Sequence, residues 1–134
     1  MEESHVVTCF VENDKQVLIV RRGARVGTYQ QRWSGISGYI EPGHSPLDQA
    51  WIELEEEAGL KPGDLSLLAE GEVLVIEDEG INKRWYIHPF RFGLGERNLV
   101  RLDWENTELA WVAPETIKTY STVPGLYDAW EKVK

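Results

Sequence analysis

Three glutamates on one flank of a predicted helix form the part of this sequence with the clearest chemical meaning. Glu53, Glu56 and Glu57 fall within roughly a hundred-degree arc of a helix that should begin near Pro46. Each like-charge pair at this spacing costs about 0.2–0.5 kcal/mol. A divalent cation would turn that repulsion into coordination, and an all-oxygen ligand set suits Mg²⁺ or Mn²⁺ rather than zinc.

The rest of this helix shows how the glutamates would be positioned. Its other arc is apolar and can face a core: Leu47, Ala50, Trp51, Leu54 and Ala58. Ser45 is a good N-cap and Pro46 a good first helical residue. Gly59 should end the helix in a left-handed conformation, and Pro62 prevents its continuation.

The segment from Gly38 to Leu60 resembles the Nudix box. That family pattern is Gly, five residues, Glu, seven residues, then Arg-Glu-apolar-any-Glu-Glu-any-Gly-apolar. The spacing is intact over all 23 positions, and seven of the nine specified residues match. The matching residues are Gly38, Glu53, Leu54, Glu56, Glu57, Gly59 and Leu60. His44 stands where the family has Glu, and Ile52 stands where it has Arg.

This resemblance implies an α/β (α+β) architecture in which a mixed β-sheet lies between α-helices, as one domain over residues 1–134. It also implies hydrolysis of a diphosphate linked to another moiety, with Mg²⁺ or Mn²⁺ as cofactor. By position in the motif, Glu53, Glu56 and Glu57 are the metal ligands, and the Gly38 carbonyl joins them. Glu53 could also help to deprotonate the attacking water.

A second candidate for the water-activating base lies outside the box. Some family members take this base from a loop ahead of a late strand that contains Trp. Glu105 lies six residues before Trp111 and resembles that loop acid. Asp103 and Glu108 compete with Glu105 for the role, and all three could instead be surface charges.

The two departures from the motif bear on activity. The family's Arg pairs with the helix acids, whereas Ile52 has no donor. His44 supplies no carboxylate and suits Mg²⁺ poorly, but it could donate to phosphate or bind a softer ion such as Mn²⁺. If the family's Arg and first Glu support one network, losing both should do less damage than losing one.

Four residues are the substrate-binding candidates: Arg22, His44, Trp33 and Tyr86. Arg22 ends a predicted strand at a position that some nucleoside-triphosphate-cleaving relatives use. Aromatic rings can stack on a base and contribute roughly 1–3 kcal/mol each; otherwise they belong to the core or its rim. ADP-ribose-cleaving relatives carry a proline about fifteen residues after the box, and residues 71–80 contain none. A nucleoside triphosphate or related nucleotide is therefore the favoured substrate.

The whole chain narrows the function class. Its 134 residues carry a net charge of −9, which argues against general nucleic-acid binding but not against a small phosphorylated substrate. The N-terminus lacks the features of a signal peptide, and no apolar run is long enough to span a membrane. The single cysteine, Cys9, fits a reducing cytoplasm. A homodimer is left open.

Two other readings compete with a working nucleotide hydrolase. A diverged Nudix domain could bind a nucleotide or partner with weak or no turnover, which the changes at positions 44 and 52 favour. An isomerase of an isoprenoid diphosphate shares the fold but needs a catalytic cysteine. Cys9 lies in a predicted strand far from the box in sequence.

The remaining elements follow from hydrophobic periodicity and turn residues. Strands are predicted over residues 5–11, 16–22, 65–76, 83–92 and 109–112, an irregular extended segment over 33–41, and a terminal helix over 124–133. In the 83–92 strand, Trp85 should face one side and Tyr86 the other.

Overall fold

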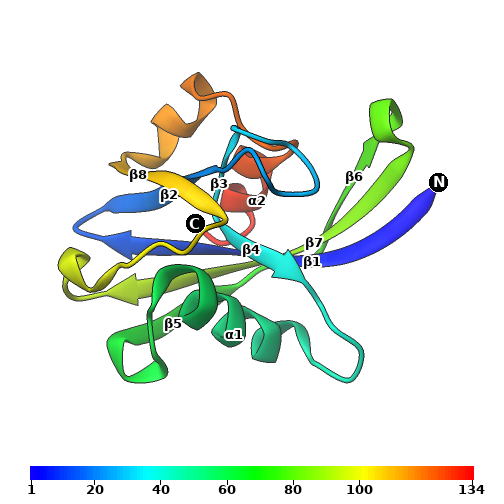
Figure 1. Cartoon of the computed structure of the whole chain (residues 1–134). Coiled ribbons are helices and arrows are strands. Elements are labelled where there is room, and N and C mark those ends of the chain that lie inside the picture. The colour runs from blue at the N-terminus through cyan, green and yellow to red at the C-terminus, as the bar shows by residue number, and fades with distance from the viewer.

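Eight strands form one mixed sheet, and helices cover both of its faces (Figure 1). The structure is a computed structural model that describes all 134 residues. The strands are β1 (Glu2–Asn13), β2 (Gln16–Arg22), β3 (Trp33–Ser34), β4 (Ile36–Tyr39), β5 (Leu65–Glu70), β6 (Leu74–Asp78), β7 (Lys83–Leu94) and β8 (Asn106–Val112). The helices are α1 (Pro46–Ala58) and α2 (Leu126–Glu131), with a 3₁₀ turn at Pro114–Thr119. This arrangement confirms the predicted fold class.

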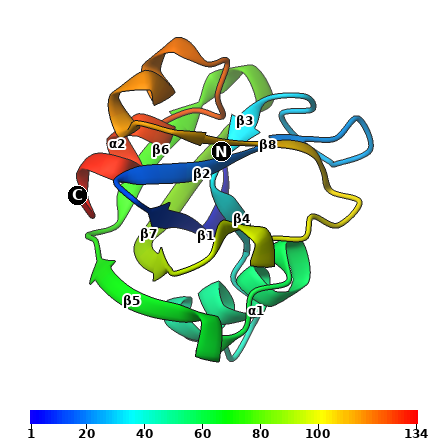
Figure 2. The ribbon, with the colours of Figure 1, turned by 90° about the vertical axis from the view of Figure 1, so that its left-hand side faces the viewer.

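The strands β1 and β2 form a hairpin and then separate. Asp14 and Lys15 both have positive φ, as a tight two-residue turn requires. The two strands pair only next to this turn. Beyond it, β3 pairs with β2 while β4 pairs antiparallel with β1, so residues 33–39 bridge the opening between them (Figure 2). This bridge brings Gly38 to the side of the sheet that α1 covers.

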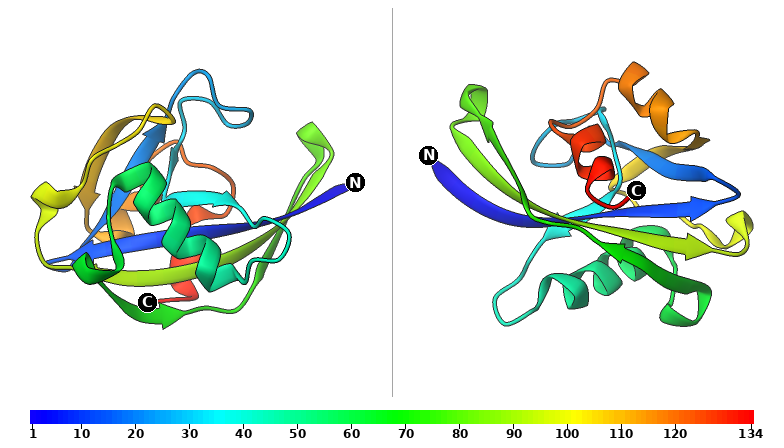
Figure 3. Two further views of the ribbon diagram at one scale, coloured as in Figure 1. Left: turned by 60° about the horizontal axis from the view of Figure 1, so that its bottom comes forward. Right: turned by 180° about the vertical axis from the view of Figure 1, so that it is seen from behind.

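A long arm extends from one end of the sheet. There β1 runs parallel to β7, and β6 pairs antiparallel with β7 on the other side. Figure 3 shows this arm projecting beyond the layers formed by α1 and α2. Trp85 and Ile87 on β7 face the α2 side, whereas Tyr86 and His88 face the opposite side, as the alternation predicted.

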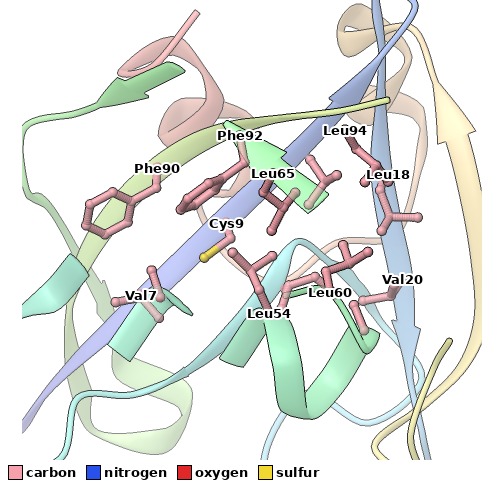
Figure 4. Close-up of a cluster of buried hydrophobic side chains, with 14 residues drawn as sticks. Val7, Cys9, Leu18, Val20, Leu54, Leu60, Leu65, Phe90, Phe92 and Leu94 are labelled. Carbon is pink, nitrogen blue, oxygen red and sulfur yellow. The ribbon is translucent and has the colours of Figure 1, made fainter. Parts of the chain in front are cut away.

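Two hydrophobic cores hold the helices against the sheet. The first lies under α1 and contains Val7, Cys9, Leu54, Leu60 and Phe92 among others (Figure 4). The second lies under α2, where Leu126, Trp130 and Val133 are buried as predicted. Leu54 is fully buried, so truncating it to Ala would cost about 2–5 kcal/mol. That cost falls on the helix that carries the glutamates.

The helix α1 and the strand β2 have the predicted residues, but the bounds of the other elements differ, and β1 and β7 are both longer than predicted. The strand predicted over residues 65–76 is two strands, β5 and β6, separated at Gly71. A Cβ at Gly71 would lie 2.8 Å from the Lys132 carbonyl oxygen, and the adjacent Pro89 has no N–H for a sheet ladder. β8 begins earlier than predicted, and α2 is shorter. No helix is both long and apolar enough to cross a membrane.

Candidate functional site

Two of the three motif glutamates are buried together at the inner edge of α1. Glu53 is 9% exposed and Glu57 is 3% exposed. Asn106, at the start of β8, donates from Nδ2 to Glu57 Oε1 over 3.1 Å. The other oxygen, Glu57 Oε2, is buried and has no hydrogen-bond partner. A buried, unpaired carboxylate oxygen costs free energy, so its retention calls for a function.

Burial makes these two carboxyl groups hard to ionise. It raises the pKa of Glu57 well above the ordinary 4.5, and the neighbouring Glu53 and Glu105 raise it further. Burial also raises the pKa of Glu53, and Glu56 and Glu41 act in the same direction. A cation between the carboxylates would reverse both effects, because it favours the charged forms.

Gly38 makes room for the Glu53 carboxyl group. A Cβ at Gly38 would overlap that carboxyl group, so any other residue would displace the Glu53 side chain from this position. The backbone of β4 therefore lies directly against the Glu53 side chain. The predicted cap at Gly59 is also confirmed: its φ is 68°, and its N–H donates to Glu55 O over 3.0 Å.

The third glutamate, Glu56, is exposed at the rim. The structure brings Glu53 and Glu57 together, but it contains no cluster of three His, Cys, Asp or Glu side chains arranged to hold a metal ion. The like-charged carboxylates thus form a buried pair and an outer member rather than a closed cage.

A pocket opens beside Gly38 in the space between the separated strands. It encloses about 130 Å³ and is lined by Val6, Thr8, Arg22, Thr28, Tyr29, Ser34, Ser37, Gly38, Tyr39, Trp85, Ile87, Glu105, Val123 and Pro124. Hydroxyl groups and aromatic rings therefore share one cavity with Arg22 and Glu105. This composition suits a ligand that has both a ring system and charged groups.

Hydrogen bonds fix the aromatic wall of the pocket. The Tyr29 hydroxyl donates to Asp78 Oδ2 over 2.7 Å and accepts from Trp85 Nε1 over 3.0 Å. Burial and the bond to Asp78 raise the pKa of Tyr29 to about 12, so the hydroxyl keeps its proton. Lys83 lies over the Trp85 ring at 4.4 Å. These contacts hold the aromatic wall together without a ligand.

Arg22 ends β2, Glu105 lies in the loop before β8, and both line the pocket. Glu105 O accepts from Gly23 N over 2.7 Å, which ties its loop to the end of β2. Arg22 donates through Nε and Nη2 to Thr28 O, so Nη1 is the nitrogen that remains for a ligand. Burial raises the pKa of Glu105, with Asp103 and Glu53 adding to the shift, while Arg22 opposes it.

The two competitors of Glu105 have other contacts. Glu108 pairs with Arg21 over 3.0 Å and is more than half exposed. Asp103 Oδ1 accepts from Glu105 N over 3.0 Å, which shapes the loop. Of the three acids, only Glu105 lines the pocket.

Three predicted substrate-binding residues, Trp33, Tyr86 and His44, do not line this pocket. Trp33 packs edge-to-face on Tyr120, with ring centroids 5.2 Å apart, as part of the second core. Tyr86 is on the other face of β7, where it stacks on His5 at 4.5 Å. Tyr29, Tyr39 and Trp85 form the aromatic lining instead. The alternation of side chains along β7 predicted that Trp85 and Tyr86 lie on opposite faces of the strand. The sequence did not indicate which of these faces borders a cavity.

The structure also shows the surroundings of Ile52 and His44, the two motif positions that depart from the family. Ile52 is half-buried and offers no polar group. His44 precedes α1 outside the pocket, and its Nδ1 lies 2.8 Å from Gln49 Oε1. The sequence did not predict a role for Gln49 or Asn106, because a single buried amide does not belong to a recognisable motif. The position of Gln49 four residues before Glu53 was the one available signal.

Cys9 lies closer to the box than its sequence position suggested. β1 pairs with β4, which places Cys9 opposite Ile36 and two residues from the partner of Gly38. The thiol is nevertheless fully buried in the first core (Figure 4). Burial, together with the charges of Glu57 and Glu53, raises its pKa well above 9.0. A buried neutral thiol is a poor nucleophile, which argues against the isomerase reading.

A sequence model of the NUDIX domain matches residues 3–130. The chain belongs to the Nudix family. It is a Nudix-type hydrolase acting on phosphoric anhydride bonds. This confirms the family and the enzyme class expected from the box.

Solved structures share the fold of this Nudix domain. The MutT protein from Methanosarcina mazei Go1 is 23% identical, with 98% of this chain and 93% of that chain covered and a TM-score of 0.77. The E. coli dihydroneopterin triphosphate pyrophosphohydrolase is 18% identical, with 96% and 92% covered and a TM-score of 0.76. A C. elegans Ap4A hydrolase is 17% identical, with 98% and 94% covered and a TM-score of 0.74. At these identities the likeness is one of fold.

Nudix hydrolases generally use divalent metal ions, and the residues of this Nudix domain fit such an ion. Glu57 Oε2 is a buried acceptor with no hydrogen-bond partner, and the neighbouring Glu53 supplies further carboxylate oxygen. Hard divalent cations prefer carboxylate and carbonyl oxygens. His44, which stands where the motif has Glu, contacts Gln49 rather than either buried carboxylate.

Proposed function

We propose that this Nudix hydrolase cleaves the diphosphate linkage of a nucleoside diphosphate derivative, most readily a nucleoside triphosphate or related nucleotide, in a reaction that depends on Mg²⁺ or Mn²⁺. Glu53, Glu56 and Glu57, with the Gly38 carbonyl, hold the ions. The nucleobase of the substrate enters the pocket beside Tyr39 and Trp85. Glu105 is the candidate for the base that activates water.

The unpaired Glu57 Oε2 is the observation that carries this proposal. It lies in a buried carboxylate pair that resists ionisation on its own, directly behind the backbone of Gly38. Gly38 also lines the pocket. The charged groups that would hold a metal-bound diphosphate therefore border the cavity that would hold the attached nucleoside.

The residues divide the work of phosphoryl transfer, in which positioning and charge neutralisation dominate. Bound divalent ions supply Lewis-acid stabilisation of the phosphate oxygens and acidify water. Arg22 offers Nη1 to a phosphate at the pocket mouth. Burial raises the pKa of Glu105, which makes its carboxylate a stronger base than an ordinary exposed glutamate. Tyr29 holds Trp85 in place for stacking.

A second candidate function is nucleotide binding with little turnover. The half-buried Ile52 favours it, because this side chain gives no hydrogen bond to the helix acids. Metal-dependent release of phosphate or pyrophosphate separates the two functions. Tight nucleotide binding without such release would support the second.

The decisive experiment is a panel of nucleoside triphosphates, dinucleoside polyphosphates and nucleotide sugars, assayed with Mg²⁺, with Mn²⁺ and with a chelator. We expect metal-dependent turnover that Glu53→Gln abolishes. Glu55→Gln is the matched control, because Glu55 is an exposed acid on the same helix outside the proposed ligand set. Equal loss in both variants, or turnover in the chelator, would reject the proposal.

A further inference from the structure

Gln49 is the most buried polar side chain of α1, at 1% exposure. A buried amide is costly unless its polar atoms are hydrogen-bonded. Here both ends are used. Gln49 Oε1 accepts from Glu41 N over 3.1 Å and lies 2.8 Å from His44 Nδ1, and Gln49 Nε2 donates to Glu53 Oε1 over 3.0 Å. One side chain thus connects the loop before the helix to a motif glutamate.

The backbone fixes the orientation of this amide. The Glu41 N–H can only donate, so the atom that faces it must be the carbonyl oxygen of Gln49. The NH₂ group then faces Glu53, where a carboxylate can only accept. Because Gln49 Oε1 is an acceptor, His44 must carry its proton on Nδ1. The donor and the acceptor of every hydrogen bond in this chain of contacts are therefore fixed.

This chain of contacts supplies the hydrogen-bond donor that position 52 lacks. Ile52 has no donor, whereas Gln49 Nε2 donates to the Glu53 carboxylate. A neutral amide orients a carboxylate without cancelling its charge, so the full charge stays available to a cation. With Oε1 held by Gln49, the other oxygen of Glu53 is left for that cation.

We propose that Gln49, held by His44 and the Glu41 backbone, is a positioning residue that sets the Glu53 carboxylate for metal binding in place of the motif's arginine. The inference rests on the proposed function, because it takes Glu53 as a metal ligand. It gives His44 a supporting role on Gln49 rather than a direct contact with substrate.

The test is calorimetric titration of the metal-free protein with Mn²⁺ and with Mg²⁺. Gln49→Met keeps the length of the side chain and removes its donor. Outer-shell partners of metal ligands typically contribute about 10–100-fold to affinity or activity, so we expect a fall in metal affinity of about that size. The kcat at saturating metal should change much less, and the metal activation constant should rise with the loss of affinity.

Gln16→Met is the matched control. Gln16 Oε1 accepts from Arg97 Nη2 over 2.8 Å at the opposite end of β2, so the variant removes a comparable side-chain contact away from the site. We expect unchanged metal affinity in this control. An equal fall in both variants would overturn the proposal, because it would indicate a general loss of structure.

His44→Ala provides a second measurement that does not depend on the folding of Gln49→Met. His44 is about one-third exposed, so its removal should be tolerated. We expect a smaller fall in metal affinity than for Gln49→Met, and no added effect of His44→Ala in the double variant, because both act through one amide.

The outcomes separate the inference from the proposed function. If the wild type binds the ions and both Gln49→Met and His44→Ala bind them equally well, the inference fails while the proposed function stands. If the wild type itself binds neither ion, both fail together. Strict additivity in the double variant would also overturn the inference.

Discussion

The two sides of the site, the aromatic wall of the pocket and the carboxylate pair of α1 behind Gly38, differ in how completely their polar groups are satisfied. On the aromatic side, the Tyr29 hydroxyl both donates and accepts, and the Trp85 N–H has a partner. On the α1 side, a buried oxygen of Glu57 has none, and burial keeps the pKa of both inner carboxyls high. The first side is complete by itself, whereas the second leaves one acceptor without a partner, which a cation would satisfy.

This difference indicates a separate binding function for each side. A wall with satisfied hydrogen bonds keeps its shape, which serves recognition of a ring. A carboxylate pair with an unused oxygen is unstable by itself, which serves the binding of a charged group. Substitutions on the α1 side should therefore affect metal binding and rate, and those on the aromatic side should affect KM.

The largest expected effect is that of Glu53→Gln. Loss of this charge removes a proposed metal ligand and a candidate base at once, so we expect kcat/KM to fall by at least about 10²–10⁴-fold, the range for a general base alone. The metal activation constant should rise in parallel. Steady-state kinetics across a Mg²⁺ series measures both. A variant with normal metal activation would show that Glu53 is no ligand.

The second-largest expected effect is that of Glu105→Gln. Glu105 lies between the aromatic wall and the carboxylate pair. We expect kcat to fall by about 10²-fold while the Mg²⁺ activation constant stays nearly unchanged, because a positioned base need not touch the metal. Glu108→Gln is the control, since Glu108 pairs with Arg21 at the surface. A fall of less than about tenfold would remove Glu105 from the mechanism.

Tyr39→Ala tests the aromatic side. Tyr39 lines the pocket and is 52% exposed, so its loss should spare the fold. Stacking on a base contributes about 1–3 kcal/mol, so we expect KM to rise about tenfold with kcat little changed. Tyr86→Ala, on the other face of β7, should leave KM unchanged. If Tyr86→Ala has the larger effect, the base binds outside this pocket.

The smallest effect is on stability and concerns Glu57. Its pKa is raised in the folded state, so the metal-free protein should be most stable below pH 4.5 with respect to this group and lose stability as pH rises through the raised value. Glu57→Gln should remove that loss and raise the Tm of metal-free protein at pH 8 by about 3 °C or more, the shift that about 1 kcal/mol produces.

Thermal melts at pH 5 and pH 8, with and without Mn²⁺, measure this effect. In the wild type, Mn²⁺ should restore the stability lost at pH 8, whereas Glu57→Gln should respond less. Equal melting temperatures at pH 8 for metal-free wild type and variant would mean that the Glu57 carboxylate is stabilised by something other than a cation.

The sequence by itself determined the local features of this protein. Ser45, Pro46 and Gly59 set the ends of α1, because capping depends on residues close in the chain. The i, i+3 and i+4 spacing set Glu53, Glu56 and Glu57 on one flank for the same reason. The alternation in β7 correctly separated Trp85 from Tyr86.

Only the tertiary structure decided which of these residues work together. Burial divides the glutamates into an inner pair and an exposed Glu56, and burial depends on packing against β4 and β8 rather than on helical period. The pocket forms where β1 and β2 separate, so its lining joins residues from 6 to 124. Gln49 and Asn106 gained their partners through contacts that are set by the packing of α1, because a single amide has no pattern that local sequence can reveal.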